Sequence, residues 1–549
     1  MKDNNKPFYI LLFVIALIVN FAGINVNFFT DDPGLYASIS KNLLYRQQFF
    51  ELFTYNQDWL DKPHFPFWMG LLSFKIFGVS VWAYRLPALL FFLLTLLYTY
   101  LFSKKYYGEQ VAWMAVLILT TAQHLIMLNT DVRAEPYLMA LVIGSVYHIS
   151  RLDERFTFTD FLLAAILTSC AIMTKGIFVV ITIYGALFGQ LIFQKRFKEV
   201  FRFKWISLVL LTIIFTLPEF YALYVQFDLH PEKTVFGKHN VSGIKWFLWD
   251  SQFGRFVNSG PISQKRSGDP FFYVHTLLWA FAPWCLLFYY AVFKNIKEIW
   301  QKHKLAEYYT LSGGLLLLLL FSLSRFQLPF YTNTIFPFFA VITAPFCCNQ
   351  LSRFGTTFRM VSFWLYGVVL VLAILVINYF ASPGHLILFV MECIAFALVA
   401  AIILFKVDKN YLKGFFLTCL AALFANFYLN TIFYNVVASY NGQIKAAEYL
   451  NRDTANHHLY SLKFENNIFQ FYSKRQIDLI SVDTFKTFNA PPHSIFFASR
   501  VTKDFLLQNH IEFKVMKAFP NYPQEIIYLA FINKSTRHKT LDSVYLITK

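Results

Sequence analysis

The chain has 549 residues, of which 57% are hydrophobic, 20% are aromatic and only 14% are charged. This composition excludes an ordinary soluble globular protein, in which about a quarter of the residues are charged. The formal net charge of +17 does not indicate a nucleic-acid partner, because the basic residues fall in short gaps between apolar runs. We therefore interpret the chain as an integral membrane protein.

The first apolar run, residues 8–27, is followed by an acidic stretch and by no small-residue cleavage site, so we interpret it as a retained helix rather than a signal peptide. A membrane helix needs about 20 apolar residues. The sequence predicts 13 such helices, near 8–27, 82–103, 110–128, 136–150, 160–174, 176–194, 205–224, 272–293, 306–322, 329–346, 360–380, 385–405 and 413–434.

The basic residues predict the orientation of these helices. Short loops rich in Lys and Arg stay in the cytoplasm. With a cytoplasmic N-terminus, 13 crossings place the basic gaps on the cytoplasmic side and the C-terminus outside; these gaps are 104–105, 195–204, 294–304, 353–359 and 406–413.

Three segments are then expected on the outer side: loops 28–81 and 225–271 and a tail, 438–549. The apolar pattern of the first loop predicts two amphipathic helices in the plane of the membrane interface. The tail alternates short β-branched or aromatic runs with turn signals and predicts a small α+β domain. We thus expect a mainly α, polytopic helix bundle over 1–437 and an extracytoplasmic domain over 438–549.

The six cysteines fall within or at the ends of apolar runs, so the sequence implies no disulfide framework. It contains no phosphate-binding loop and no dinucleotide fingerprint. Energy from nucleotide hydrolysis is therefore not expected.

Ionisable residues gather at the predicted outer ends of the helices. Asp31 and Asp32 follow the first helix, although an Asp before Pro33 is also typical of a helix N-cap. The others are Asp61, Lys62, His64, Asp131, Arg133, Glu135, Lys175 and Arg325. A lone Lys at such a place is often only an interfacial anchor.

Carboxylates and cations at an outer membrane surface suit a lipid-phosphate-linked donor. Cations hold the phosphate and stabilise it as a leaving group, and a carboxylate takes the proton of the acceptor. The apolar grooves between helices would hold the lipid tail.

Six motifs occur in order over about residues 8–345: DDPGLYASISKNLL, LDKPHFPFWMGLLSFKIFGVSVWAYRLPALL, TDVRAEPYLMAL, AIMTKGIFVV, SGDPFFYVHTLLWAFAPW and FSLSRFQLPFYTNTIFP. In this order they resemble the polytopic GT-C glycosyltransferases of the protein mannosyltransferase and lipid A aminoarabinose transferase type. The resemblance implies a GT-C fold and a membrane glycosyltransferase.

The resemblance also implies roles for single residues. Asp32 matches the family's essential acidic position, with Asp31 as the close alternative, and Asp131 matches a second acidic site. Tyr36 stands in the matching place beside Asp32, and Lys62 matches a lysine that contacts the lipid phosphate. Arg325, where relatives often have Lys, and Lys175 complete the expected donor-binding set.

Three departures from the family pattern affect the expected sugar and metal. Pro33 and Leu35 replace an acidic residue and an Arg of the aminoarabinose transferases, so that donor sugar is not implied. Asp61 and Asp269 replace a Glu and a His, which would favour a harder cation such as Mg²⁺ or Mn²⁺ if a metal ion is used.

The sequence therefore predicts an inner-membrane glycosyltransferase that takes a sugar from a polyprenyl phosphate and transfers it, on the periplasmic face, to a lipid, glycan or protein. No nucleic-acid partner is expected. A polytopic transporter or lipid flippase is the alternative, although transporters commonly carry inverted repeats with a midplane site, and the sequence shows no such repeat.

Overall fold

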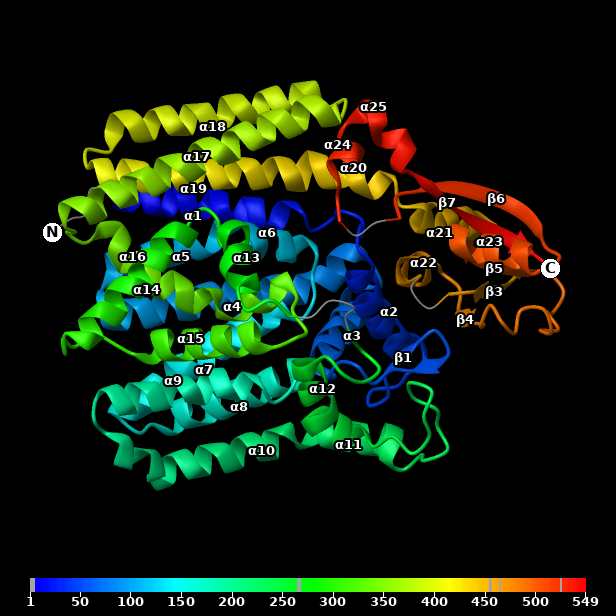
Figure 1. Cartoon of the computed structure of the whole chain (residues 1–549), viewed down its shortest axis with the longest axis horizontal. Coiled ribbons are helices and arrows are strands. Elements are labelled where there is room, and N and C mark those ends of the chain that lie inside the picture. The colour runs from blue at the N-terminus through cyan, green and yellow to red at the C-terminus, as the bar shows by residue number, and fades with distance from the viewer. Residues whose placement is uncertain (1–4, 264–267, 454–456, 464–465, 524–525) are drawn as a thin grey trace.

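The computed structural model describes residues 5–263, 268–453, 457–463, 466–523 and 526–549. Its helices run side by side as a bundle, and a small α/β domain stands at one end of the bundle (Figure 1). This arrangement confirms the predicted fold class. The N-terminal end of the described chain lies at the opposite end of the bundle from this domain (Figure 1).

Each of the 13 predicted segments contains a helix. The bundle consists of α1 (Lys6–Ala22), α4 (Val81–Tyr107), α5 (Glu109–Thr120), α6 (Gln123–Thr130), α7 (Glu135–Glu154), α8 (Phe158–Lys175), α9 (Val179–Phe193), α10 (Phe203–Leu223), α13 (Phe272–Ala280), α14 (Cys285–Trp300), α15 (Tyr309–Leu323), α16 (Phe336–Cys348), α17 (Arg353–Ala381), α18 (Leu386–Lys406) and α19 (Asn410–Tyr428).

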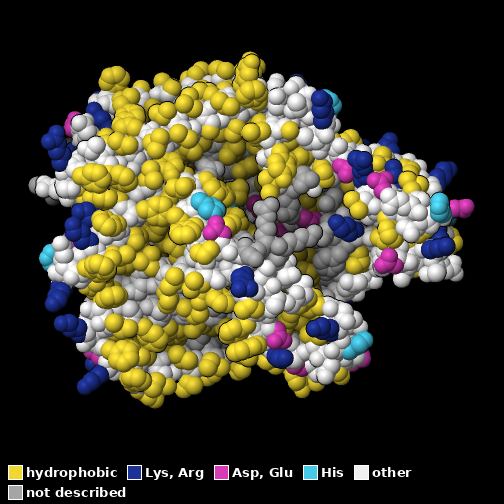
Figure 2. Space-filling model, in the orientation of Figure 1, with side chains coloured by type: hydrophobic (Ala, Val, Ile, Leu, Met, Phe, Trp, Pro, Cys, Tyr) yellow, Lys and Arg dark blue, Asp and Glu magenta, His cyan; other side chains and the backbone are white. Residues whose placement is uncertain are grey.

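Among the described residues, seven helices are long and apolar enough to cross a membrane. The pair α5 and α6 is bent by 58° and passes the same test as one span, whereas α1, α9 and α15 are apolar but shorter. Hydrophobic side chains cover much of the visible face of the bundle, and Lys and Arg lie towards its two ends, at the end away from the α/β domain and on that domain itself (Figure 2). The chain is a multi-pass membrane protein.

The first outer loop forms two helices, as predicted: α2 (Asp31–Tyr45) and α3 (Phe65–Phe77), with a short hairpin of β1 (Phe53–Thr54) and β2 (Gln57–Asp58) between them. The second outer loop holds α11 (Gly243–Lys245) and α12 (Ser251–Val257). Both loops lie at the end of the bundle that carries the α/β domain (Figure 1).

The α/β domain has a five-stranded sheet in the order β4-β3-β5-β7-β6. β3 is parallel to β4 and β5, and β7 is antiparallel to β5 and β6. The strands are β3 (His458–Ser461), β4 (Ile477–Leu479), β5 (Ser494–Ser499), β6 (Lys514–Asn521) and β7 (Asp542–Thr548); the helices are α20 (Tyr434–Ser439), α21 (Gly442–Arg452), α22 (Asn467–Tyr472), α23 (Arg500–Gln508), α24 (Leu529–Ile532) and α25 (Lys534–Arg537).

Arg85, in the Arg-Leu-Pro motif of α4, ties the site-bearing loops to the bundle. Its fully buried guanidinium donates to the carbonyl oxygens of Gly23 at 3.1 Å, Ile24 at 3.0 Å and Thr130 at 2.7 Å. A buried guanidinium needs such a set of acceptors to offset its lost hydration. Arg85 thereby holds the segment before α2 next to the turn that begins with Asp131.

Candidate active site

Three of the predicted site residues of the first loop face a cavity of about 1350 Å³ between the loops and the α/β domain, which Tyr36 and Lys62 do not line. Asp31, Asp32 and Asp61 line this cavity from the bundle side. From the α/β domain it is lined by Asn466, Asn467, Ile468, Ser499, Arg500, Val501, Asn521 and Tyr522, among others.

Arg133 joins the two predicted acidic residues. Its Nε lies 3.1 Å from an oxygen of Asp131, and another of its nitrogens is bonded to Asp32. The hydroxyl of Thr30 also donates to Asp131. Asp131 is buried, whereas the Asp32 side chain is 45% exposed. Of Asp32 and Asp131, Asp32 is therefore the carboxylate that a molecule in the cavity can reach.

Asp61 accepts hydrogen bonds from both Lys62 and Arg255. Burial raises the pKa of Asp61, but the charges of Arg255 and Lys62 outweigh burial, so the pKa lies below its usual value. Burial, together with the charge of Arg255, lowers the pKa of Lys62 to about 8. Lys62 and Arg255 thus share one carboxylate partner, Asp61.

Arg255, on α12, was not predicted from the sequence. No local pattern distinguishes it from the other cations of the second loop, and only its tertiary pairing with Asp61 reveals it. Lys62, Arg255 and Lys175 line a second, smaller cavity, and Asp61 lines both cavities. Asp61 therefore marks the place where the two cavities meet.

Lys175, at the end of α8, forms a buried ion pair with Glu135 at the start of α7. Its Nζ lies 4.2 Å from the ring centroid of Tyr331, which follows Pro329 in the 3₁₀ turn η4 (Pro329–Ile335). Phe330 of the same turn lies 4.6 Å from the guanidinium of Arg133. One aromatic turn thus contacts the cations of two motifs that are far apart in the sequence.

Tyr36, on α2, is buried against Phe67, with ring centroids 5.1 Å apart. Burial and the negative charges of Glu135, Asp32 and Asp61 raise the pKa of Tyr36 well above its ordinary value. The phenol therefore stays protonated at neutral pH and can donate a hydrogen bond, but it cannot act as a base.

Asp31 has a different environment from Asp32. It accepts hydrogen bonds from the backbone nitrogen of Asn467 at 3.1 Å and from the side-chain nitrogen of Asn467 at 2.6 Å. Asn467 is the first residue of α22, where a carboxylate is favourable. Asp31 is thus engaged in binding the α/β domain.

The expectation that the Asp pair caps a loop helix needs a correction. α2 begins at Asp31, and its N-cap residue is Thr30, whose side chain makes no capping hydrogen bond. The hydroxyl of Thr30 is turned to Asp131 instead. Asp31 and Asp32 lie in the first helical turn, so their side chains are directed to tertiary partners.

Arg325 does not join this group of ion pairs. Its side chain is exposed, and in the described parts of the chain it forms no ion pair. Its backbone nitrogen donates to the carbonyl oxygen of Phe256 at 2.9 Å, next to Arg255. The predicted contact between Arg325 and a phosphate stays a prediction, and Arg255 is the cation that accompanies Lys62.

The residues present do not fit the metal site suggested by Asp61 and Asp269. Asp61 is occupied by two cationic side chains, which compete with a metal ion. Asp269 is half exposed, and one of its oxygens accepts from the backbone nitrogen of Phe271 at 2.9 Å. The described residues contain no group of three or more His, Cys, Asp or Glu side chains that could hold a metal ion.

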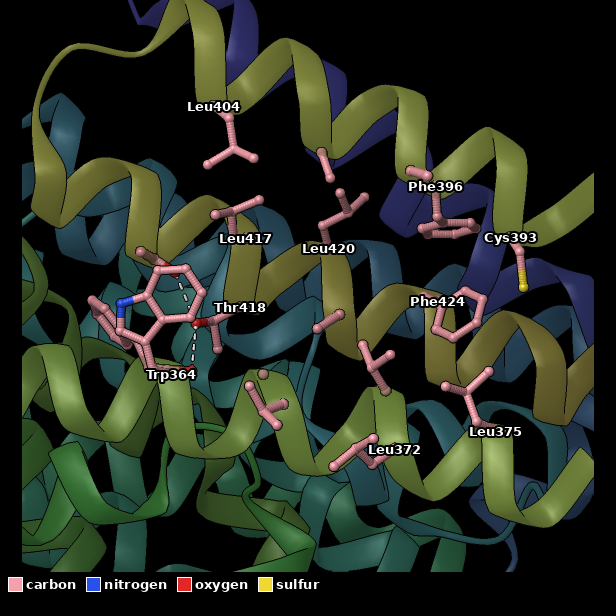
Figure 3. A pocket seen from close by; sticks show the side chains of 18 residues that line it. Trp364, Leu372, Leu375, Cys393, Phe396, Leu404, Leu417, Thr418, Leu420 and Phe424 are labelled. Atoms are coloured by element: carbon pink, nitrogen blue, oxygen red, sulfur yellow. Dashed lines mark hydrogen bonds between the residues drawn. The ribbon is translucent and has the colours of Figure 1, made fainter.

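A third cavity, of about 500 Å³, is an apolar groove between α17, α18 and α19 (Figure 3). It is lined by side chains such as Leu372, Leu375, Phe396, Leu417 and Phe424 and by no charged residue. Such a groove suits hydrocarbon and offers nothing to a phosphate or a reacting hydroxyl.

Comparison with known proteins agrees with the resemblance of the motifs. The family described as dolichyl-phosphate-mannose-protein mannosyltransferase matches residues 61–221. An uncharacterised protein of Aquifex aeolicus is 27% identical over 67% of this chain and 69% of its own length. The undecaprenyl phosphate-alpha-4-amino-4-deoxy-L-arabinose arabinosyl transferase of Yersinia pestis is 22% identical over 69% of this chain and 66% of its own length.

The crystal structure of ArnT from Cupriavidus metallidurans bound to undecaprenyl phosphate is similar over 98% of this chain and 97% of its own, with a TM-score of 0.74 and 16% identity. The apo structure of the same protein has a TM-score of 0.72. At this identity the likeness shows a common fold. Together with the matched family and relatives, it shows that the chain is similar in fold and in part of its sequence to the GT-C glycosyltransferases of the protein mannosyltransferase and aminoarabinose transferase type.

Proposed function

We propose that the protein is a membrane glycosyltransferase that takes a sugar from a polyprenyl-phosphate-linked donor. The observation that carries this proposal is the placement of Lys62 and Arg255 at one cavity and Asp32 at a second cavity, with Asp61 at the border of both. The donor phosphate would lie against Lys62 and Arg255, with Lys175 close by. The acceptor would enter the larger cavity beside Asp32.

In this arrangement Asp32 takes the proton of the acceptor hydroxyl as that oxygen attacks the anomeric carbon. The bond from the sugar to the phosphate oxygen breaks, and the leaving polyprenyl phosphate gains one negative charge. Lys62 and Arg255 stabilise that charge, because fixed cations in a partly buried site act more strongly than in water. Arg133 orients Asp32.

The relatives support the donor class. The Yersinia protein is named for an undecaprenyl-phosphate-linked sugar, and the ArnT structure contains undecaprenyl phosphate. Neither relative determines the acceptor of this chain, which is a lipid, a glycan or a protein. A transporter or flippase is less well supported, because the ion pairs lie at the outer ends of helices rather than at mid-depth.

We infer that the short basic loops face the cytoplasm, and that the outer loops and the domain over 438–549 face the periplasm of an inner membrane. The Lys and Arg residues of short loops such as 195–204 and 294–304 support this orientation. Fusing a periplasm-dependent reporter after Lys549 and another within 195–204 tests it. A silent C-terminal reporter together with an active one within 195–204 would contradict it.

The test of the function is transfer of a sugar by wild-type protein and by Asp32→Asn in membranes. Loss of a general base lowers the rate by about 10²–10⁴. Transfer at the wild-type rate by folded Asp32→Asn would show that Asp32 is not the base.

A further inference from the structure

His64 and Glu219 form a buried pair beside the Lys62 pocket that the proposed chemistry does not use. His64 directly precedes α3, and Glu219 lies near the outer end of α10. Their side chains are 1% and 0% exposed. Nδ1 of His64 lies 3.0 Å from one carboxylate oxygen of Glu219, and the backbone nitrogen of His64 lies 3.1 Å from the other.

The other ring nitrogen of His64 also has a hydrogen-bond partner. Nε2 lies 3.1 Å from the carbonyl oxygen of Phe50, which can only accept, so Nε2 must carry a hydrogen. Nδ1 also faces an oxygen of Glu219. The contact between Nδ1 and Glu219 is therefore a hydrogen bond, and both ring nitrogens of His64 are paired.

The pair lies close to Lys62 in the chain, and the segment between them has little conformational freedom. Only Pro63 stands between Lys62 and His64, and the proline ring fixes the backbone angle φ at that position. Glu219 itself lines the small cavity together with Lys62 and Arg255. His64 thus attaches the segment that carries Lys62 to α10 on one side and to the loop at Phe50 on the other.

We propose that Glu219 and His64 are positioning residues that hold the Lys62 ammonium in place to bind the donor phosphate. The proposal rests on the function proposed for Lys62. It concerns an indirect role, because neither His64 nor Glu219 needs to touch the phosphate. Its distinguishing consequence is that removing the pair affects phosphate binding only while Lys62 is present.

A double-mutant cycle on the full-length protein tests this, with undecaprenyl phosphate as the probe and its dissociation constant Kd as the readout. Lys62→Ala should raise Kd by roughly 10- to 100-fold, since a hydrogen bond to a charged group contributes about 1.5–3 kcal/mol. Glu219→Ala should raise Kd by about tenfold in the wild-type background and by less than about twofold in the Lys62→Ala background.

Two further variants separate positioning from folding. Glu219→Gln can still accept from the His64 backbone nitrogen and donate to Nδ1 of a neutral imidazole, so its Kd should stay within about threefold of wild type. Glu219→Asp is one methylene shorter and loses the contact with His64, so it should raise Kd as Glu219→Ala does. It takes the place of Glu219→Ala in the cycle if that variant does not fold. The thermal midpoint of each variant reports whether it is folded.

The outcomes are distinguishable. Equal effects of Glu219→Ala, or of Glu219→Asp, with and without Lys62 would overturn the positioning role while leaving the proposed function intact. An unchanged Kd in Lys62→Ala would instead remove Lys62 from the donor site, and the inference about Glu219 would fall with it. A wild-type Kd in folded Glu219→Ala would also overturn the inference.

Discussion

Asp31 and Asp32 are neighbours in the chain but serve different partners. Asp31 accepts two hydrogen bonds from Asn467 at the start of α22, and Asp32 pairs with Arg133 at the edge of the cavity. Lys41, further along α2, donates to the carbonyl oxygens of Gln470 at 2.8 Å and Phe471 at 3.0 Å, at the far end of α22. The same helix α2 thus presents the proposed base and binds both ends of α22.

The two aspartates should therefore respond differently to the same substitution. Asp32→Asn should lower transfer by about 10²–10⁴ with little change in thermal midpoint. Asp31→Asn should lower the thermal midpoint, because it weakens the contact with α22, and should keep measurable transfer. Transfer and thermal midpoint are measured on both proteins. The reverse pattern would make Asp31 the base.

The two candidate phosphate-binding arginines provide a matched comparison. Arg255 is largely buried and pairs with Asp61, whereas Arg325 is exposed. Arg255→Ala should raise the Kd for undecaprenyl phosphate by at least about tenfold, and Arg325→Ala by less than about threefold. A larger effect of Arg325→Ala would restore the assignment made from the sequence.

Phosphate binding should weaken as the pH rises, because the pKa of Lys62 is lowered to about 8 by burial and by Arg255. Above that pH the ammonium loses its charge. The Kd for undecaprenyl phosphate should increase between about pH 7 and about pH 9, and the increase should be absent in Lys62→Arg, whose side chain stays charged. An identical pH dependence in Lys62→Arg would exclude Lys62 as its source.

The effect of Lys62 on stability has a definite sign. Its pKa in the folded protein lies below the unfolded value of about 10.4, so the unfolded chain binds more protons between about pH 8 and about pH 10. The contribution of Lys62 to the free energy of unfolding should therefore rise with pH across that window. The thermal midpoints of wild type and Lys62→Met, compared across it, measure this difference.

Lys41 should determine how firmly the α/β domain is held. Lys41→Met leaves the backbone acceptors at the end of α22 unpaired in a buried place, which costs about 1–3 kcal/mol. We expect faster proteolysis within 438–549 and a lower transfer rate, because α2 also carries Asp32. Lys474→Met, at an exposed position of the same domain, is the control. Equal proteolysis of the two variants would contradict this role.

Chelation should leave transfer intact, because the donor set around Asp61 does not fit a divalent cation. The measurement is the transfer rate after exhaustive treatment with a chelator, before and after Mg²⁺ or Mn²⁺ is added back. A rate that falls on chelation and returns with the metal would show that ligands are supplied in another arrangement.

The sequence predicted the bundle well because apolar runs and basic loops follow from the physics of the bilayer. It also predicted which loops gather ionisable residues. It did not separate Asp31 from Asp32, since the two differ only in their tertiary partners, Asn467 and Arg133. Arg255 was missed for the same reason, because its place beside Lys62 depends on the packing of α12 and not on a local pattern.

The most direct test of the central claim is mass spectrometry of lipids and glycoconjugates from membranes that carry either the wild-type protein or Asp32→Asn at equal abundance. We expect a product heavier by one sugar, together with release of the polyprenyl phosphate, in wild-type membranes only. Identical products in both membranes, with both proteins folded, would contradict a sugar transfer that depends on Asp32.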